Sequence, residues 1–414
     1  MNRRSFLHTV AGSTALAAAA RTLSPTVARA ATDPVLAAAI AVLPQTYLTP
    51  QGEFYNVERG KPLPYKLPPE KRLQVGLERE TWQLEILADP DGPEGKRAKL
   101  DRPRSKEAGN AFNFADLMKL AETKAVRFLK VVSCNNIFAP LGLGVWEGVP
   151  LRDVLWPAGP VENVRHIFYD GYHNDDPAQL FQCWLPANRV FEDPPGMLPV
   201  IVCYKINGEW LTGERGGPVR MVVPEAYGFK SVKWLQRVVL TNKHQSDDTY
   251  ANGNNDTNDS WLKTWARFEQ VPGTVQAGAA FAITGQAQVG VSGLAKVQYW
   301  LHPQGVPWPA DDPTFTRAPW QDAEVLPLPE RWHGGAEIGA LHPAQFDAAT
   351  GRPREWPMRY AWCHWAALLR EEKPGKYDVR CRTVDVAGFA QPLPRPFKKS
   401  GRNAIVSQPL EVLA

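Results

Sequence analysis

The sequence lacks the short motifs that most directly identify a haem, a zinc site or a nucleotide. It contains no C-x-x-C or C-x-x-C-H spacing and no paired cysteine and histidine ligands, which excludes c-type haem attachment and zinc fingers. There is no G-x-G-x-x-G after an expected strand and no Walker loop, so neither a dinucleotide nor a nucleoside triphosphate is indicated. No stretch after the N-terminus approaches 18 uninterrupted apolar residues, which predicts a protein without a membrane anchor.

The sequence also lacks a large excess of charge of one sign. The net charge is +4 over 414 residues and no dense basic run occurs, which argues against nucleic-acid binding. The nearest candidate, Arg395–Arg402, has four basic residues and is interpreted as a solvated tail.

The N-terminus predicts export in the folded state. Asn2-Arg3-Arg4-Ser5-Phe6-Leu7 is a twin-arginine signature, Val10–Ala20 is a short apolar core, and Ala28-Arg29-Ala30 offers an A-x-A cleavage site. We therefore assign residues 1–30 to a twin-arginine signal peptide and expect a periplasmic protein. Because this route accepts folded proteins, it favours a complex cofactor inserted before export.

The five cysteines leave at least one unpaired in an exported protein. Met358–Leu369 and Lys376–Val386 read as the two strands of a hairpin. Its turn would place Cys381 opposite Leu368 and not opposite Cys363. We therefore expect no disulfide between these two cysteines.

Composition predicts many short strands. Hydrophobic residues make up 44% and charged residues 22%, as in soluble globular proteins, and 38 prolines and 32 glycines leave few helical patterns. We expect a strand at Trp82–Leu87, a helix at Asn113–Ala121, a polar connection at Asp247–Ser260 and a β-sandwich from about residue 270. The Trp- and Pro-rich residues 303–355 read as a long insertion.

A lone cysteine follows the apolar strand that begins at Ala125. Val131-Val132-Ser133-Cys134 ends that strand, and a Gly- and Pro-rich loop is expected from Ala139 to Gly148. Ligands gather at the carboxyl ends of strands in α/β sheets, and a thiolate there is a soft ligand for a redox metal. The alternative is a buried structural cysteine, because free Cys is among the most buried residue types.

Three cations accompany tight glycine-containing turns. Arg215, Arg220 and Lys233 lie in segments where backbone N–H groups can approach an anion, and Arg suits phosphate bidentately. The alternative is ordinary surface cations beside hairpins. His166, His173 and His244 show no ligand spacing and are interpreted as ordinary polar or core residues.

Three blocks in this order resemble the sulfite oxidase family of molybdopterin enzymes. The first is Cys134 with Val145–Leu155, similar to the family's cysteine and "W-x-G-x-x-L-x-D-V-L". The second is Tyr204–Leu235, similar to "A-Y-x-M-N-G-E-x-L … G-x-P-x-R-x-x-V-P … V-K-W-L". The third runs from Tyr360 to Pro392 and looks like the family's C-terminal dimerisation domain.

The resemblance implies an α+β protein with two domains. Residues 31–265 would form a mixed α/β molybdopterin-binding domain, and residues 266–414 an immunoglobulin-like β-sandwich that forms a homodimer. The implied activity is two-electron oxygen-atom transfer at molybdenum on a small oxyanion or sulfur compound. Electrons would pass to a separate carrier such as a c-type cytochrome, since this chain has no haem motif.

The resemblance also implies roles for the matched residues. Cys134 would bind molybdenum, and Tyr204 would stand beside the metal's oxo ligand. The molybdopterin phosphate would be held by four further residues: Arg215, Arg220, Ser231 and Lys233.

Three departures from the family's pattern bear on the substrate. The Gly/Arg substrate segment of the C-terminal domain is replaced by Val291-Ser292-Gly293-Leu294-Ala295-Lys296. Family members often continue C-A-G-N-R after the thiolate, whereas this chain reads Cys134-Asn135-Asn136-Ile137-Phe138 and lacks that arginine. The N-terminal F-V-R-N-H pattern is blurred into Phe54–Arg59. A reductase similar to the periplasmic methionine sulfoxide reductase is an alternative, because Val223–Lys230 resembles its V-P-x-x-Y-G-F-K run. A cofactor-free exported binding protein is a second alternative.

Overall fold

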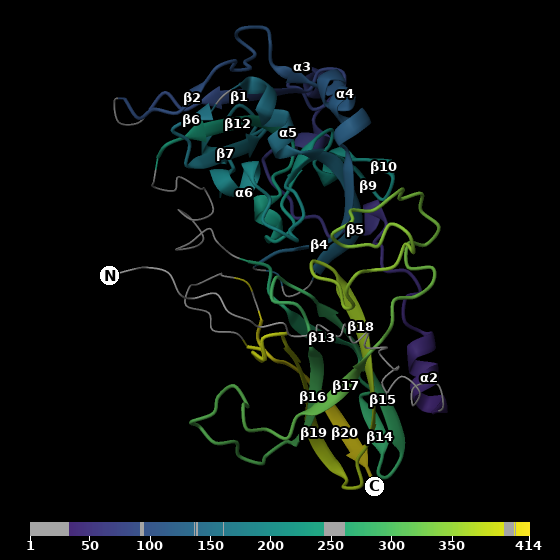
Figure 1. Cartoon of the computed structure of the whole chain (residues 1–414). Coiled ribbons are helices and arrows are strands. Elements are labelled where there is room, and N and C mark those ends of the chain that lie inside the picture. The colour runs from purple at the N-terminus through teal and green to yellow at the C-terminus, as the bar shows by residue number, and fades with distance from the viewer. Residues whose placement is uncertain are drawn as a thin grey trace, which may run out of the picture.

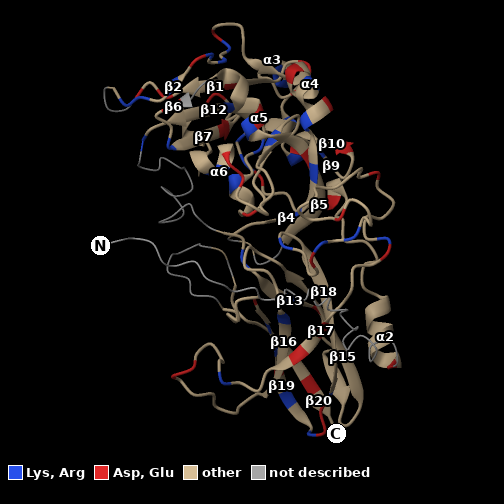
Figure 2. Cartoon of the chain, viewed as in Figure 1, with Lys and Arg blue, Asp and Glu red and all other residues tan. Residues whose placement is uncertain are grey.

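The computed structural model describes residues 33–91, 95–135, 137, 140–159, 161–243, 261–392, 401 and 403–414. The expected signal peptide, the polar connection Asp247–Ser260, His244 and the basic residues of 395–402 lie outside the described residues. Figure 1 shows a mixed upper part, built of short strands and helices, above a curled sheet that ends at the C-terminus. Basic and acidic positions are interspersed over both parts (Figure 2).

The upper part contains two five-stranded sheets. The first has the order β3 (Phe112–Asn113), β1 (Gln83–Ala88), β12 (Leu235–Thr241), β7 (His166–Gly171) and β8 (Gln182–Pro186). The second has the order β10 (Glu209–Trp210), β9 (Ile201–Ile206), β5 (Pro140–Pro150) and β4 (Val126–Ser133), with β11 (Arg220–Val222) also paired to β9. A two-stranded sheet joins β2 (Lys99–Leu100) to β6 (Val161–Glu162).

Four of the described helices accompany these sheets: α3 (Pro69–Gln74), α4 (Phe114–Lys124), α5 (Leu151–Leu155) and α6 (Ala187–Phe191). The fifth, α2 (Pro34–Ala41), lies against the C-terminal sheet. The start of α4 confirms the helix that the sequence predicts. Asn113 accepts a hydrogen bond from the Asp116 N–H at 2.9 Å, and Asp116 accepts one from the Asn113 N–H at 3.2 Å. This reciprocal cap satisfies two N–H groups that a helix start otherwise leaves unpaired.

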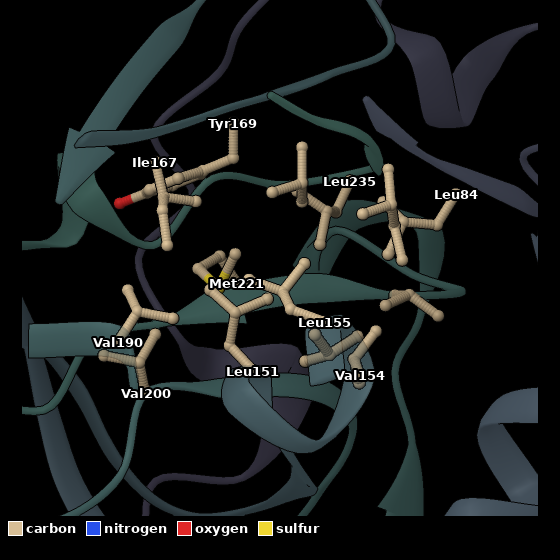
Figure 3. Close-up of a cluster of buried hydrophobic side chains, with 14 of the residues drawn as sticks. Leu84, Leu151, Val154, Leu155, Ile167, Tyr169, Val190, Val200, Met221 and Leu235 are labelled. Carbon is tan, nitrogen blue, oxygen red and sulfur yellow. The ribbon is translucent and has the colours of Figure 1, made fainter. Parts of the chain in front are cut away.

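An apolar core lies between the two five-stranded sheets. Figure 3 shows side chains from β1, α5, β7, β11 and β12 converging on one space. Leu84, Leu151, Leu155, Met221 and Leu235 are fully buried there. Each such burial contributes about 1.5–3 kcal/mol relative to an exposed side chain, so this core fixes the two sheets against each other.

The C-terminal part is a curled eight-stranded sheet. Its order is β13 (Trp265–Gln270), β15 (Ala280–Gln288), β18 (Trp362–Arg370), β17 (Gln321–Val325), β16 (Lys296–Pro303), β19 (Gly375–Val384), β20 (Val406–Leu413) and β14 (Thr274–Gln276). Helix α2 packs on β15 and β18, and Leu36 of the helix and Leu43 after its end share a buried cluster with Ala366. The structure therefore has a β-rich mixed domain followed by a curled β-sheet domain.

The expected loop from Ala139 to Gly148 is wrong, because β5 is an 11-residue strand paired with β4 and β9. Its glycines serve close packing. A Cβ at Gly148 would lie 2.5 Å from the Val202 carbonyl oxygen, and one at Gly142 would lie 2.4 Å from the Phe54 ring. Glycine inside a strand often marks such a close approach, which a sequence pattern does not distinguish from a loop.

The expected hairpin between Met358–Leu369 and Lys376–Val386 is also wrong. Strand β18 pairs with β15 and β17, whereas β19 pairs with β16 and β20. The absence of a Cys363–Cys381 disulfide is confirmed, although the reason is the separation of the two strands. All five cysteines lie in the described part of the chain and none is disulfide-bonded.

Part of the expected insertion at 303–355 belongs to the curled sheet. It contains β17, the strand that joins the two halves of that sheet. Residues 326–361, here called the connecting segment, then run from β17 back to β18 along the edge strand β4. The His342 N–H donates to the Arg127 carbonyl at 2.7 Å, and the Val131 N–H donates to the Tyr360 carbonyl at 2.6 Å.

Gln345 completes this edge. Its side-chain oxygen accepts from the Leu129 N–H at 2.9 Å, and its side-chain nitrogen donates to the Leu129 carbonyl at 2.8 Å. Gln345 is 7% exposed, so these bonds are shielded from water. An edge strand needs such cover, since its free N–H and C=O groups otherwise invite pairing with another chain.

We predict that Gln345→Leu destabilises the protein. The substitution leaves the buried N–H and C=O groups of Leu129 without partners, at about 1–3 kcal/mol each, so a loss of about 2–6 kcal/mol is expected in denaturant unfolding. The matched control is Gln304→Leu, which removes an exposed side-chain bond to Asp378 and should change the free energy of unfolding little. Equal stability of the two variants would contradict the assignment.

Candidate cofactor site

A cavity opens beside the end of β4. Its walls come from seven segments of the chain: 54–60, 132–135, 141–146, 171–173, 179–181, 215–220 and 228–234. Its empty volume is about 1230 Å³, including the open mouth. The structure places Cys134, Arg215, Arg220, Ser231 and Lys233 in the lining of this cavity.

Cys134 directly follows β4 and lines the cavity. It is half-buried, with its Sγ atom 4.0 Å from the Asn135 side-chain oxygen. The other four cysteines are buried and do not line the cavity: Cys183, Cys203, Cys363 and Cys381. Cys134 is therefore the thiol placed to meet a bound group.

Arg220 lies at the centre of the cationic wall and is 5% exposed. Its guanidinium donates to the Arg215 carbonyl at 2.8 Å and to the Ser231 carbonyl at 2.6 Å, and it lies 5.2 Å from the centroid of the Trp146 ring. The Nε atoms of Arg220 and Arg215 are buried without hydrogen-bond partners. Buried donors of this kind are normally satisfied, so they fit an anionic ligand in the cavity.

The charges in this wall are incompletely compensated. Burial lowers the pKa of Arg220 to about 10 and, with Arg220 and Arg215 nearby, lowers the pKa of Lys233 to about 7. Burial also lowers the pKa of Arg215, which the half-exposed Glu214 opposes through a 3.0 Å ion pair. Desolvation and mutual repulsion both disfavour these cations, and a bound anion would relieve both.

Local backbone geometry explains why the cations meet. The Gly213–Arg215 turn starts at Thr212, whose hydroxyl accepts from the Arg215 N–H at 3.4 Å. Gly216 then adopts φ +94°, and a Cβ there would lie 2.7 Å from the Lys233 Cβ. Glycine alone allows both the left-handed backbone and this approach.

Tyr204 is not brought to the cavity. Its hydroxyl donates to the Glu147 carboxylate at 2.9 Å, and the same carboxylate accepts from Arg127 at 2.7 Å. Burial and then the Glu147 charge raise the pKa of Tyr204. Successive residues of a strand point to opposite faces, so Tyr204 faces the core between the sheets while Cys203 faces the other way.

Sequence reasoning missed several residues of the cavity wall. Arg59 lines the cavity, its pKa is lowered by burial, and its guanidinium lies 4.1 Å from the Phe181 ring centroid. Asn56 is outside the cavity lining but supports it, because its side-chain oxygen accepts from the Lys233 ammonium at 2.8 Å. Both belong to Phe54–Arg59, the segment that only partly matches the family's F-V-R-N-H pattern, and this partial match is the sequence feature that could have identified them. His173 also lines the cavity, with a buried Nδ1 atom that has no partner.

His166 makes ordinary polar contacts, as expected. Its Nδ1 atom lies 2.7 Å from the Lys243 carbonyl, and its ring packs edge-on to Trp184. Among the described residues, no group of three or more His, Cys, Asp or Glu side chains could hold a metal ion. None of the described helices is long and apolar enough to cross a membrane.

The residues of the cavity fit molybdopterin. The phosphate would meet Arg215, Arg220 and Lys233, whose charges lack full compensation. Ser231 lines the same cavity, and its hydroxyl accepts from the Val223 N–H at 3.2 Å. Cys134 supplies one soft donor, which suits a metal whose remaining ligands arrive with an organic group.

Comparisons with known proteins agree with this fit. Residues 101–250 match the family model for the oxidoreductase molybdopterin binding domain. Mitochondrial sulfite oxidase of Drosophila melanogaster is 28% identical over 207 residues, covering 49% of this chain and 33% of that protein. Sulfite oxidase of Gallus gallus is 26% identical over 208 residues (48% and 41% covered), and the NADH nitrate reductase of Spinacia oleracea is 33% identical over 115 residues (27% and 12%).

A solved structure extends the likeness to the fold of both domains. The sulfane dehydrogenase SoxCD from Paracoccus pantotrophus superposes with a TM-score of 0.53 at 18% identity, covering 80% of this chain and 76% of that chain. The matched stretches span less than half the length of each curated relative named above. The matched model identifies residues 101–250 as an oxidoreductase molybdopterin binding domain, and the relatives show that the chain is similar to sulfite oxidases over about half of its length.

Proposed function

We propose that this chain is a periplasmic, sulfite dehydrogenase-like enzyme that oxidises a small sulfur compound or oxyanion. The observation that carries the proposal is one cavity in which Cys134 faces incompletely compensated buried cations. When bound, molybdopterin supplies a molybdenum centre for two-electron oxygen-atom transfer.

The chain's own residues divide into two tasks. Cys134 provides a thiolate at the end of a strand held on both edges. Arg215, Arg220 and Lys233 bind and orient the phosphate, and the apolar ring of Trp146 keeps water from the Arg220 guanidinium. Fixed charges of this kind act strongly because they need no reorganisation when the ligand arrives.

The substrate is proposed from the charge left near the cavity mouth. The arginine expected after Cys134 is absent, but Arg59 and His173 line the same cavity from other segments. A small anion needs converging cations to offset its desolvation. The relatives' names, sulfite oxidase and sulfane dehydrogenase, support a sulfur compound.

Export, assembly and electron transfer complete the proposal. The twin-arginine sequence supports a periplasmic location, and the absence of a haem motif in the sequence supports a separate acceptor such as a c-type cytochrome. An immunoglobulin-like C-terminal domain would form the homodimer. The alternative of a sulfoxide reductase is less well supported, because the resemblance to that enzyme does not include a C-terminal sheet domain.

We predict that the purified chain contains near-stoichiometric molybdenum and that sulfite bleaches its thiolate-to-metal absorption. Metal analysis without molybdenum would overturn the enzymatic proposal and favour a binding protein. Molybdenum whose absorption is unchanged by sulfite, but restored by a sulfoxide after chemical reduction, would instead identify a reductase.

The Cys134→Ser variant tests the ligand within the same experiment. It should keep the circular dichroism of the wild type, lose the thiolate-to-metal absorption and lose at least about 100-fold in turnover, as expected when a metal's surroundings are altered. Cys381→Ala, at a buried position in the C-terminal sheet, is the control and should keep the absorption. Wild-type turnover in Cys134→Ser would refute the ligand assignment.

We predict that anion binding weakens as pH rises through about 7. Sulfate, which does not titrate in this range, should favour the protonated Lys233 amine, whose pKa is lowered to about 7 in the free cavity. Raising the pH from 6 to 8 deprotonates this amine, so the affinity should fall by up to about tenfold in calorimetric titrations of the cofactor-free chain.

The matched variant is Lys233→Arg, which keeps the charge throughout this range. It should bind sulfate with a flatter pH profile, which separates Lys233 from other titrating groups in the cavity. A wild-type profile identical to that of Lys233→Arg would contradict the prediction.

We predict that Tyr204→Phe keeps its molybdenum and most of its turnover. The hydroxyl bonds Glu147 outside the cavity, so its loss should cost about 1–3 kcal/mol of stability, as expected when a buried carboxylate loses a donor. Thermal unfolding and steady-state kinetics measure the two effects. A large loss of turnover at unchanged stability would support the role beside the metal that the resemblance implies.

A further inference from the structure

We propose that Lys130 is a positioning residue that links the strand presenting Cys134 to the segment presenting the phosphate-binding residues. The inference rests on the proposed function for its meaning, since Cys134 is taken as the metal ligand. The hydrogen bonds of Lys130 that support the inference all lie outside the cavity.

Lys130 lies in β4, four residues before Cys134, and is 0% exposed. Its ammonium group donates to the Val131 carbonyl at 3.1 Å and to the Ala226 carbonyl at 2.9 Å. Its own carbonyl accepts from the Trp146 indole N–H of β5 at 3.0 Å. One residue therefore bonds its own strand, the neighbouring strand and a distant segment.

Ala226 begins the stretch that carries two residues of the anion-binding wall, Ser231 and Lys233, whereas Arg215 and Arg220 precede it. The turn Gly228–Lys230 follows, and then Ser231 and Lys233. A Cβ at Gly228 would lie 3.0 Å from the Val132 side chain and 3.3 Å from the Ser133 carbonyl oxygen. The two walls thus meet immediately before Cys134, and the Lys130–Ala226 bond lies beside this meeting point.

A buried lysine is a costly way to make this link. Burial lowers the pKa of Lys130 to about 7, while the nearby Glu225 opposes that shift. Glu225 is already paired with Arg189 at 2.8 Å, so it does not contact Lys130 as a dedicated partner. An apolar side chain would avoid the desolvation cost but could not bond Ala226, which indicates that the position serves geometry.

The functional consequence is a fixed distance between the Cys134 thiol and the wall of cations that would bind the phosphate. A ligand that engages both must match their spacing, and errors of about 1 Å in such arrangements reduce rates substantially. Removing the Lys130 link would let the two walls move independently, although Cys134, Arg220 and Lys233 would all remain.

The test uses the full chain without cofactor and measures alkylation of each cysteine by iodoacetamide with mass spectrometry. Cys134 is the half-buried thiol and the other four are buried, so local loosening and global unfolding give different patterns. Lys130→Met should raise the alkylation rate at Cys134 by about fivefold or more and leave the other four unchanged. An unchanged rate at Cys134 would overturn the proposal.

Thr241→Val is the control for simple destabilisation. It removes a buried 2.7 Å bond to Asp89 at the far end of β12 and does not touch β4. Its Cys134 rate should equal that of the wild type. A Cys134 rate raised as much as in Lys130→Met would show a general loss of stability and would also overturn the proposal.

A measurement on the wild type covers the case in which Lys130→Met does not fold. Sulfate bound by the cationic wall should slow amide hydrogen exchange at residues 131–134, because the link transmits the ordering of one wall to the other. Absence of this protection at saturating sulfate would overturn the proposal. Neither readout needs molybdenum, so a wild type without molybdenum would remove the proposed function while leaving this test intact.

Discussion

The bonds made by the buried Arg220 guanidinium are the interaction on which the candidate site depends. One side chain bonds the carbonyls of Arg215 and Ser231, so it fixes two segments of the wall while keeping its Nε atom directed to no protein partner. The Trp146 ring covers one face of the group. An anion would complete the surroundings of a cation buried in this way, and the cavity supplies the room for one.

The need to satisfy buried polar groups also explains why both edges of β4 are fully hydrogen-bonded. Its inner edge pairs with β5, and its outer edge is satisfied by the Gln345 side chain and by backbone groups of His342 and Tyr360. Buried backbone groups require partners, and here a connecting segment from the C-terminal sheet provides them. The position of Cys134 thus depends on residues more than 200 positions later in the chain.

Part of this arrangement could be predicted from the sequence. The cap at Asn113, the strand before Cys134 and the meeting of Arg215, Arg220 and Lys233 follow from local patterns and motif order. The strand β5 could not be predicted, because its glycines, such as Gly148, report contacts with another strand and resemble loop glycines in one dimension. The predicted pairing in the C-terminal sheet was wrong for a different reason: β18 and β19 are consecutive in the sequence, but each pairs with other strands.

The contrast between Tyr204 and Lys130 shows which kind of information was missing. A motif match gives Tyr204 a position in the sequence, but its face of β9 depends on the strand's register, which directs the hydroxyl to Glu147. Lys130 belongs to no motif and looks like a surface lysine in an apolar strand, yet its amine is fully buried. Motifs identify the side chains that contact a ligand. The contacts that fix the positions of those side chains depend on the surrounding fold, which a motif does not describe. In this chain the position of Cys134 depends on the buried Lys130, on the fully hydrogen-bonded outer edge of β4, and on the connecting segment that provides those hydrogen bonds.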